Sequence, residues 1–171
     1  MEEPGKSIAF STSDLFTLGV ELEFQILDHS SMALTSQAPA LFDAAPSILK
    51  PRLSQEFLCS ILEVQTGICF SLRDVENDLL QTCSLAEELA AERDCLLFAS
   101  SLHPFSPPEE QVLTSNDRYI QIMDELQQVG RDFMAQGLHV HVGVPDGDTA
   151  INVCNGLQAF LPIMLALSCS S

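Results

Sequence analysis

The chain has 171 residues, the length of one domain, and its 46% hydrophobic residues can supply a core. Seven Lys and Arg residues stand against 24 Asp and Glu residues, so the formal net charge is −17. Such a surface repels phosphate backbones and anionic lipids, which argues against a nucleic-acid partner and a membrane partner.

The cysteines and the chain start predict a cytoplasmic location. Six cysteines lie in apolar segments without Cys-x-x-Cys spacing, as buried free thiols of a reduced protein do. The first residues lack the basic start and apolar core of a signal peptide. The longest apolar run, Ala159–Leu167, contains Pro162 and is too short to span a bilayer. We expect a polar tail over residues 1–14 and one soluble domain over residues 15–171.

The first predicted element is a strand at Thr17–Asp28. Its apolar residues alternate with Glu21, Glu23 and Gln25, which is typical of a half-buried strand. Side chains two residues apart share a strand face, so Glu21 and Glu23 project together and repel each other. This pair is either part of a solvated sheet face or half of a site for a divalent metal ion.

The rest of the chain predicts alternating helices and strands. In order we expect a short helix around Ala40–Ala45, a strand within Leu58–Phe70, and a helix from a capping box at Ser71–Asp74 to about Arg93. A buried strand at Cys95–Ser100 and a helix from a cap at Thr114–Asp117 to Gly137 follow. The chain then continues with a strand at Leu138–Val144 and a last helix that is capped by Asp148 and kinked by Pro162. The apolar stripe from Ile122 to Met134 is predicted to be core. This order predicts an α+β fold with an antiparallel-rich sheet of about four strands and helices packed on one face.

Three predicted strands carry polar side chains at the same two-residue spacing. The pairs are Glu21/Glu23, Glu63/Gln65 and His139/His141. Carboxylates are ligands for Mg²⁺ or Mn²⁺, and imidazole suits Mn²⁺ or Zn²⁺ and can contact phosphate. A His-x-His strand alone fits a structural role equally well, but three such strands favour a metal site.

The evidence for other catalytic motifs is weaker than the evidence for a metal site. The sequence has no Gly-x-Ser-x-Gly elbow and no phosphate-binding Gly-x-x-x-x-Gly-Lys loop. His103 is either a ligand or a loop histidine bonded to backbone. Arg118 either binds a substrate carboxylate or forms a surface ion pair.

Several of these segments together resemble the type 2 glutamate–cysteine ligase family, also called carboxylate–amine ligases and related to glutamine synthetase. The matching segments are Gly19-Val-Glu-Leu-Glu-Phe24, Leu62-Glu-Val-Gln-Thr-Gly-Ile-Cys69, Leu102-His-Pro-Phe105, Arg118-Tyr119, Gly137-Leu-His-Val-His-Val-Gly-Val-Pro-Asp146 and the helix from Asn155 to Ser168. The resemblance runs from about Leu15 to the last residue. The family continues through a further half with more strands and basic residues, so we expect the N-terminal half of a glutamine synthetase/glutamate–cysteine ligase-like catalytic domain.

The resemblance implies an ATP-dependent ligase that joins a glutamate-like carboxylate to a cysteine-like amine through an acyl phosphate. It implies that Glu21, Glu23 and Glu63 hold Mg²⁺, with Mn²⁺ as the alternative ion. It also implies catalytic and nucleotide-binding roles for His139 and His141 and a substrate contact for Arg118. A half domain is expected to be incomplete for activity and to need another copy or a C-terminal half as partner. The alternative function is a non-catalytic remnant or a metal- and nucleotide-binding assembly module.

Overall fold

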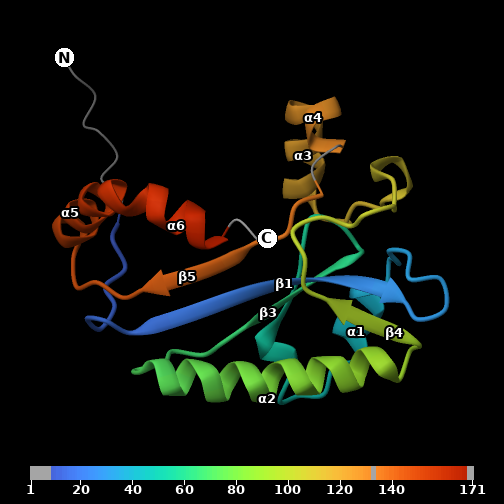
Figure 1. The fold of residues 1–171 in the computed structure, drawn as a ribbon, viewed down its shortest axis with the longest axis horizontal. Coiled ribbons are helices and arrows are strands. Elements are labelled where there is room, and N and C mark those ends of the chain that lie inside the picture. The colour runs from blue at the N-terminus through green and yellow to red at the C-terminus, as the bar shows by residue number, and fades with distance from the viewer. Residues whose placement is uncertain (1–8, 132–133, 169–171) are drawn as a thin grey trace.

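The sheet is built around one long strand, β1 (Leu18–Asp28), in the computed structural model, which describes residues 9–131 and 134–168. One edge of β1 pairs with β3 (Ile61–Gln65), and β3 pairs in turn with β2 (Leu53–Gln55). The other edge pairs with β5 (Leu138–Val142) along its first residues and with β4 (Cys95–Phe98) along its last. All four pairings are antiparallel. The expected α+β fold with an antiparallel sheet is confirmed (Figure 1).

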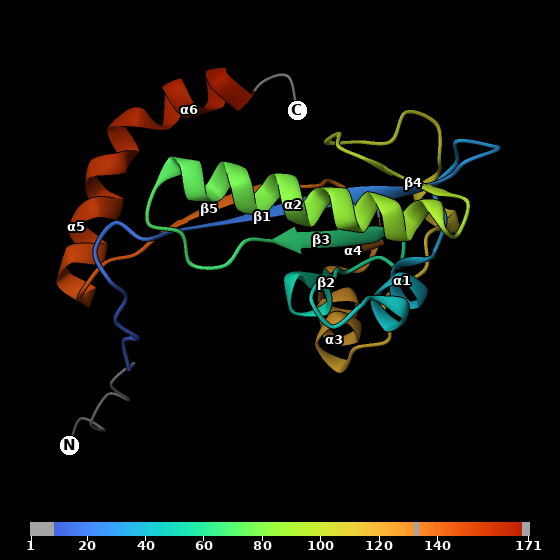
Figure 2. The ribbon, with the colours of Figure 1, turned by 90° about the horizontal axis from the view of Figure 1, so that it is seen from below.

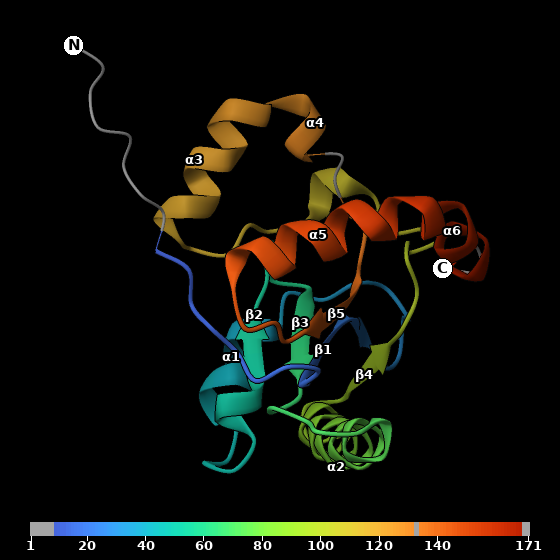
Figure 3. The ribbon, with the colours of Figure 1, turned by 90° about the vertical axis from the view of Figure 1, so that its left-hand side faces the viewer.

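The apolar side of this sheet packs against α1 (Ala38–Ala44) and α2 (Leu72–Ala91). Ile26, Leu62 and Val64 come from the sheet and are completely buried against residues of these helices. Figures 1 and 3 show α2 along one side of the sheet and the later helices on the other. The predicted packing of helices on one face is therefore correct for α1 and α2.

Local capping explains where α2 begins. The Ser71 side chain accepts a hydrogen bond from the Asp74 amide at 3.2 Å, and the Asp74 carboxylate accepts one from the Phe70 amide at 3.1 Å. These bonds satisfy amides that have no partner inside the helix. The capping box expected at Ser71–Asp74 is thus present, with the return bond made one residue earlier than in the usual form.

β3 is shorter than the second strand that was expected within Leu58–Phe70. The sheet also contains β2, a strand that the sequence did not predict. β2 follows directly after a 3₁₀ turn at Lys50–Arg52, where Pro51 had indicated only a break. Three residues are too few to show a clear alternation, which explains the omission. Among the described residues the sheet consequently has five strands instead of the expected four or so.

The helix expected from Thr114 to Gly137 is wrong in length and in burial. α3 (Asp117–Leu126) ends at Gln127, whose φ of 51° is left-handed, and α4 (Gln128–Arg131) is a separate turn. Leu126 and Val129 are 47% and 69% exposed, and Ile122 and Met123 are half-buried, so much of the stripe predicted as core is not in the core. Met134 is buried, and Phe133 of the same stripe lies outside the described residues.

The last helical segment, called here the arm, runs through α5 (Gly147–Leu157), a 3₁₀ turn at Gln158–Phe160 and α6 (Leu161–Ser168). Its cap is Asp146, which accepts from the Thr149 amide at 2.7 Å, so the cap predicted at Asp148 is wrong. The 3₁₀ turn falls just before Pro162, where a kink was expected, and Figure 2 shows the arm bending there.

The arm is longer and more apolar as a helix than the short run at Ala159–Leu167 suggested. Its 22 residues, Gly147–Ser168, reach a mean hydropathy of 1.6, and none of that stretch is buried. By length and composition alone it could cross a membrane, a test that core helices of soluble proteins also pass. Within the described part of the chain, the segment is therefore an uncovered apolar surface.

The cysteines follow the expectation in most cases. Cys59, Cys69 and Cys95 are buried free thiols, and Cys83 is half-buried. Cys154 on α5 is a free thiol too, but it is exposed, because no described residue covers the arm there. Cys169 lies outside the described residues.

Leu62 tests the core between the sheet and the helices. Leu62→Ala should lower the free energy of unfolding by about 2–5 kcal/mol, because the side chain is completely buried in the main cluster. Leu80→Ala on α2 is the matched control, since that leucine is 63% exposed and should change stability little. Urea unfolding followed by circular dichroism measures both; equal losses would contradict this placement of the core.

Candidate functional site

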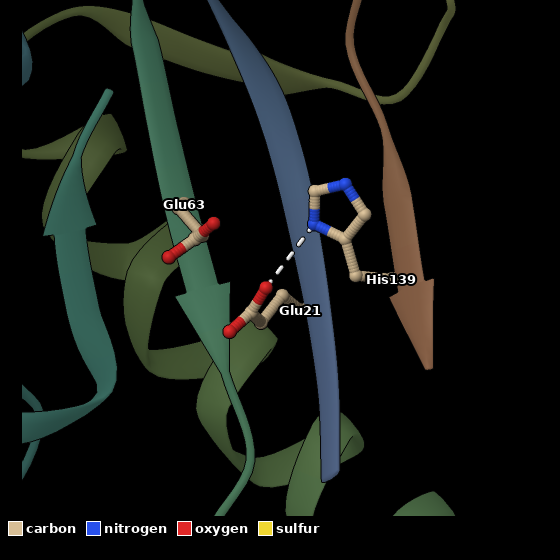
Figure 4. Close-up of side chains that lie close together, drawn as sticks. All are labelled: Glu21, Glu63 and His139. Carbon is tan, nitrogen blue, oxygen red and sulfur yellow. Dashed lines mark hydrogen bonds and ion pairs between the residues drawn. The ribbon is translucent and has the colours of Figure 1, made fainter. Parts of the chain in front are cut away.

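The strand register brings the three predicted polar pairs onto one face of the sheet. Glu23 is paired with Glu63 and Glu21 with Gln65 across β1 and β3. On the other edge of β1, Glu21 is paired with His139. Directly paired residues of antiparallel strands point to the same side. Figure 4 shows Glu21, Glu63 and His139 on three neighbouring strands, pointing toward one another.

Both histidines of β5 contact one carboxylate. The Nδ1 atom of His139 and the Nε2 atom of His141 each lie 3.1 Å from Oε2 of Glu21. Hydrogen bonding and charge attraction, from His141 first and then from His139, hold the pKa of Glu21 below its usual value, against a smaller opposing effect of burial. Glu21 is therefore kept ionised, and the two imidazoles are oriented by it.

Glu63 is in the opposite situation. Its side chain is buried, at 7% exposure, and burial together with the nearby charges of Glu56, Glu21 and Glu23 raises its pKa to about 7. Burial also raises the pKa of Glu56, with the charges of Glu23 and Glu21 adding to the effect. Carboxylates this close repel one another unless a proton or a cation relieves them. The site thus favours binding of positive charge.

Glu56 is the functional residue that sequence reasoning missed. It follows β2, and Ser54, two residues earlier, is paired with Glu63 across β2 and β3. Ser54 and Glu56 therefore repeat the two-residue spacing of the other strands. The signal was present, but it required recognising a three-residue strand.

The side chains form two groups that could each hold a cation. Glu21, Glu63 and His139 make the first, and Glu23, Glu56 and Glu63 make the second. Within each group, one ligand atom per residue lies within 4.8 Å of the others. Glu63 belongs to both, so the two groups share one buried carboxylate. Oxygen-rich ligands of this kind suit Mg²⁺ and Mn²⁺.

Gly137 lies beside Glu23 of the second group and His139 of the first. The Gly137 amide donates to Oε2 of Glu23 at 2.9 Å, which orients that carboxylate. A Cβ atom at Gly137 would lie 3.1 Å from Nε2 of His139 and 3.6 Å from Oε1 of Glu23. A larger residue would therefore be tight against His139 and in ordinary contact with Glu23.

An open cleft of about 970 Å³ extends from Glu21 and His141. Its walls carry hydroxyl groups, backbone of Thr66 and Gly67, and the exposed side chains of Ile68 and Phe70. The described residues that line it include no Lys or Arg. The cleft suits an uncharged, partly apolar group attached to whatever binds at the carboxylates.

The two remaining candidates form no hydrogen bond or ion pair with this cluster among the described residues. His103 bonds to backbone on both sides, with Nε2 3.0 Å from the Met32 carbonyl oxygen and Nδ1 accepting from the Ser106 amide. It is a structural loop histidine. Arg118 is exposed at the start of α3, and among the described residues it forms no ion pair. The surface ion pair offered as its alternative role is therefore not found there.

Comparison with known proteins decides the family. The model of glutamate–cysteine ligase family 2 matches residues 17–171. The chain belongs to glutamate–cysteine ligase family 2. A relative from Gloeobacter violaceus is 37% identical over 171 residues, and one from Sorangium cellulosum is 38% identical over 158 residues. Both are provisionally named glutamate–cysteine ligase 2.

This family 2 chain spans less than half the length of these relatives. The matches cover 96% and 91% of the chain but 45% and 42% of the two relatives. A solved glutamate–cysteine ligase from Francisella tularensis, in complex with AMP, matches with a TM-score of 0.59 at 15% identity. That match covers 87% of this chain and 31% of the other, and at this identity it establishes the fold alone.

Glu63 should make the stability of this family 2 chain fall as pH rises. A carboxyl group whose pKa is raised from 4.5 to about 7 by folding binds its proton more tightly in the folded state. Stability is therefore greatest below the ordinary pKa and is lost as pH rises through about 7. Without metal, Glu63→Gln should gain on the order of 2 kcal/mol over the wild type at pH 8, and little at pH 4.

Thermal unfolding in EDTA across this pH range measures the effect. Glu76→Gln, an exposed acid on α2, is the matched control and should give a curve parallel to the wild type. A constant difference between Glu63→Gln and the wild type at all pH values would contradict the raised pKa.

Proposed function

We propose that this chain supplies the metal- and nucleotide-binding part of an ATP-dependent carboxylate–amine ligase. The acid would be glutamate-like and the amine cysteine-like, as the family name indicates. The observation that carries the proposal is the pair of carboxylate groups that share Glu63. The activity belongs to a complete ligase domain, of which this chain matches less than half.

The residues present fit Mg²⁺. Four carboxylates converge, one of them buried with a raised pKa, and bound cations would replace the proton that otherwise relieves their repulsion. Glu21, Glu63 and His139 would hold one ion, and Glu23, Glu56 and Glu63 a second. When bound, the ions would neutralise phosphate charge and polarise the transferred phosphoryl group.

The nucleotide is proposed to lie along the open cleft with its phosphates at the carboxylate end. The cleft has no basic side chain among its described lining residues, so phosphate charge must be met at the metal groups instead. Phe70 and Ile68 are largely exposed beside the cleft and would contact the base. The AMP complex of the Francisella ligase agrees with nucleotide binding but establishes nothing about this cleft.

The proposed reaction has two transfers. A carboxylate oxygen of the acid attacks the γ-phosphorus of ATP, which releases ADP and forms an acyl phosphate. The amine nitrogen then attacks the acyl carbon, loses a proton, and phosphate leaves as the amide forms. His141 lines the cleft and is 61% exposed on its side chain, so it can donate a hydrogen bond to a phosphate oxygen. His139 keeps Glu21 in place.

Glu56 gives a sharp test, because sequence patterns did not single it out. Glu56→Gln should weaken Mg²⁺-dependent ATP binding roughly tenfold or more, since one ligand of the second group loses its charge. Isothermal titration of Mg·ATP into the chain measures this, with Glu76→Gln as control. Unchanged affinity in Glu56→Gln, or in Glu21→Gln combined with Glu23→Gln, would contradict the metal role. Binding without phosphate release by a completed domain would favour the non-catalytic alternative.

Phe70 tests the proposed orientation of the nucleotide in the cleft, with its base beside Phe70 and its phosphates at the carboxylates. Phe70→Ala should weaken ATP binding by about 1 kcal/mol through lost stacking while leaving the affinity for Mg²⁺ alone unchanged. Phe160→Ala, an exposed phenylalanine on the arm, is the matched control. An equal affinity of Phe70→Ala and the wild type for ATP would show that the base lies elsewhere.

A further inference from the structure

One wall of the open cleft is formed within residues 66–70, called here the wall segment, which connect β3 to α2. Two residues of this segment are tied to β1. The amide and hydroxyl of Thr66 bond to the carbonyl and amide of Val20 at 2.9 and 3.0 Å. Cys69 and Leu18 exchange two backbone hydrogen bonds of 2.9 and 2.8 Å. Gly67 lines the cleft between these two ties.

Asp78 on α2 holds the middle of the wall segment. Its Oδ2 atom accepts a hydrogen bond from the Gly67 amide at 3.0 Å and lies 3.2 Å from Nη2 of Arg52. Its Oδ1 atom accepts from the Thr82 hydroxyl at 3.0 Å. Both carboxylate oxygens therefore have partners, and these come from the wall segment, from the 3₁₀ turn before β2 and from α2 itself.

Arg52 packs directly against the backbone of Gly67. A Cβ atom at Gly67 would lie 2.5 Å from Nη1 and 2.8 Å from Nη2 of Arg52, which is closer than real Cβ contacts allow. A side chain at this position would have to push the guanidinium away from Asp78. Glycine is thus required here by the ion pair behind the wall segment.

The anchored segment presents two apolar side chains beside the cleft. Ile68 and Phe70 are 76% and 72% exposed, so packing does little to hold them. The Phe70 amide donates to the Asp74 carboxylate at 3.1 Å, and Asp78 lies one helical turn after Asp74 on the same side of α2. The positions of both apolar side chains therefore depend on hydrogen bonds between the segment's backbone and α2.

We propose that Asp78, paired with Arg52, is a positioning residue for the nucleotide. It acts through the wall segment, which it holds at the place where the base would bind. Neither Asp78 nor Arg52 is among the described residues that line the cleft or form the two carboxylate groups. A segment that is already fixed spares the nucleotide the entropy cost of ordering it. The inference rests on the proposed function, since it takes this cleft to be the nucleotide site.

A role in stability alone is the alternative. The side chains of Arg52 and Asp78 are 34% and 21% exposed, and ion pairs with this much solvent around them contribute little to stability. Loss of a purely stabilising pair would affect every ligand of the site alike. Loss of a positioning pair would affect only ligands that carry a base. The two roles therefore differ in what they predict for a ligand with a base and for one without.

The test compares two probes, Mg·ATP and Mg·tripolyphosphate, by isothermal titration into the 171-residue chain. Tripolyphosphate supplies the phosphates without ribose or base. Asp78→Ala should weaken Mg·ATP binding roughly fivefold or more and leave the affinity for Mg·tripolyphosphate unchanged. Hydrogen exchange at the Gly67 amide should become faster in the same variant. Glu76→Ala, which changes an exposed acid on α2, is the matched control and should alter none of these values.

Arg52→Gln carries the same comparison if Asp78→Ala fails to fold, since Arg52 is partly exposed and its loss leaves the Gly67 bond to Asp78 possible. It too should weaken the binding of Mg·ATP alone. The inference is overturned if both probes lose affinity equally, if Mg·ATP affinity is unchanged, or if exchange at Gly67 stays slow; these results leave the proposed function standing. A wild type that binds neither probe overturns the proposed function, and this inference with it.

Discussion

Repulsion among carboxylates is the constraint on which this site depends. Glu63 is fixed between Glu21, Glu23 and Glu56 by strand pairing, so it cannot move away from their charge. The sheet holds this arrangement because its other face is anchored by buried Ile26, Leu62 and Val64 against two helices. Packing energy on one face thus maintains unfavourable electrostatics on the other. A bound cation would relieve this repulsion, so the arrangement favours cation binding.

Alternation along strands made much of the site predictable. The two-residue spacing at Glu21/Glu23, Glu63/Gln65 and His139/His141 fixes which side chains share a strand face. It does not fix the register of strand pairing. The register is what pairs His139 with Glu21, where a shift by two residues would pair it with Gly19. The contribution of Glu56 required knowing β2, which is too short to show a period. Spacing therefore identified the ligand types, while pairing determined which of them meet.

Predictions of burial failed where the chain lacks a neighbour to pack against. The stripe at Leu126 and Val129 and the apolar face of β5 have the spacing of core residues, yet they are exposed. The spacing of apolar residues indicates that a face is suited to burial. It does not indicate that a partner for this face lies within the same stretch of sequence. The same reasoning applies to the arm, whose composition satisfies a membrane test and a core-helix test equally.

The uncovered edge and the missing positive charge lie side by side. β5 carries His139 and His141 toward the carboxylates on one face, and within residues 9–131 and 134–168 no strand pairs with its outer edge. A polyanionic nucleotide at an acidic sheet needs cations from metal ions and from basic side chains. This chain offers ligands for the metal ions, and its described cleft offers no basic side chain. A nucleotide at this sheet would therefore depend for its countercharge on metal ions held by those carboxylates.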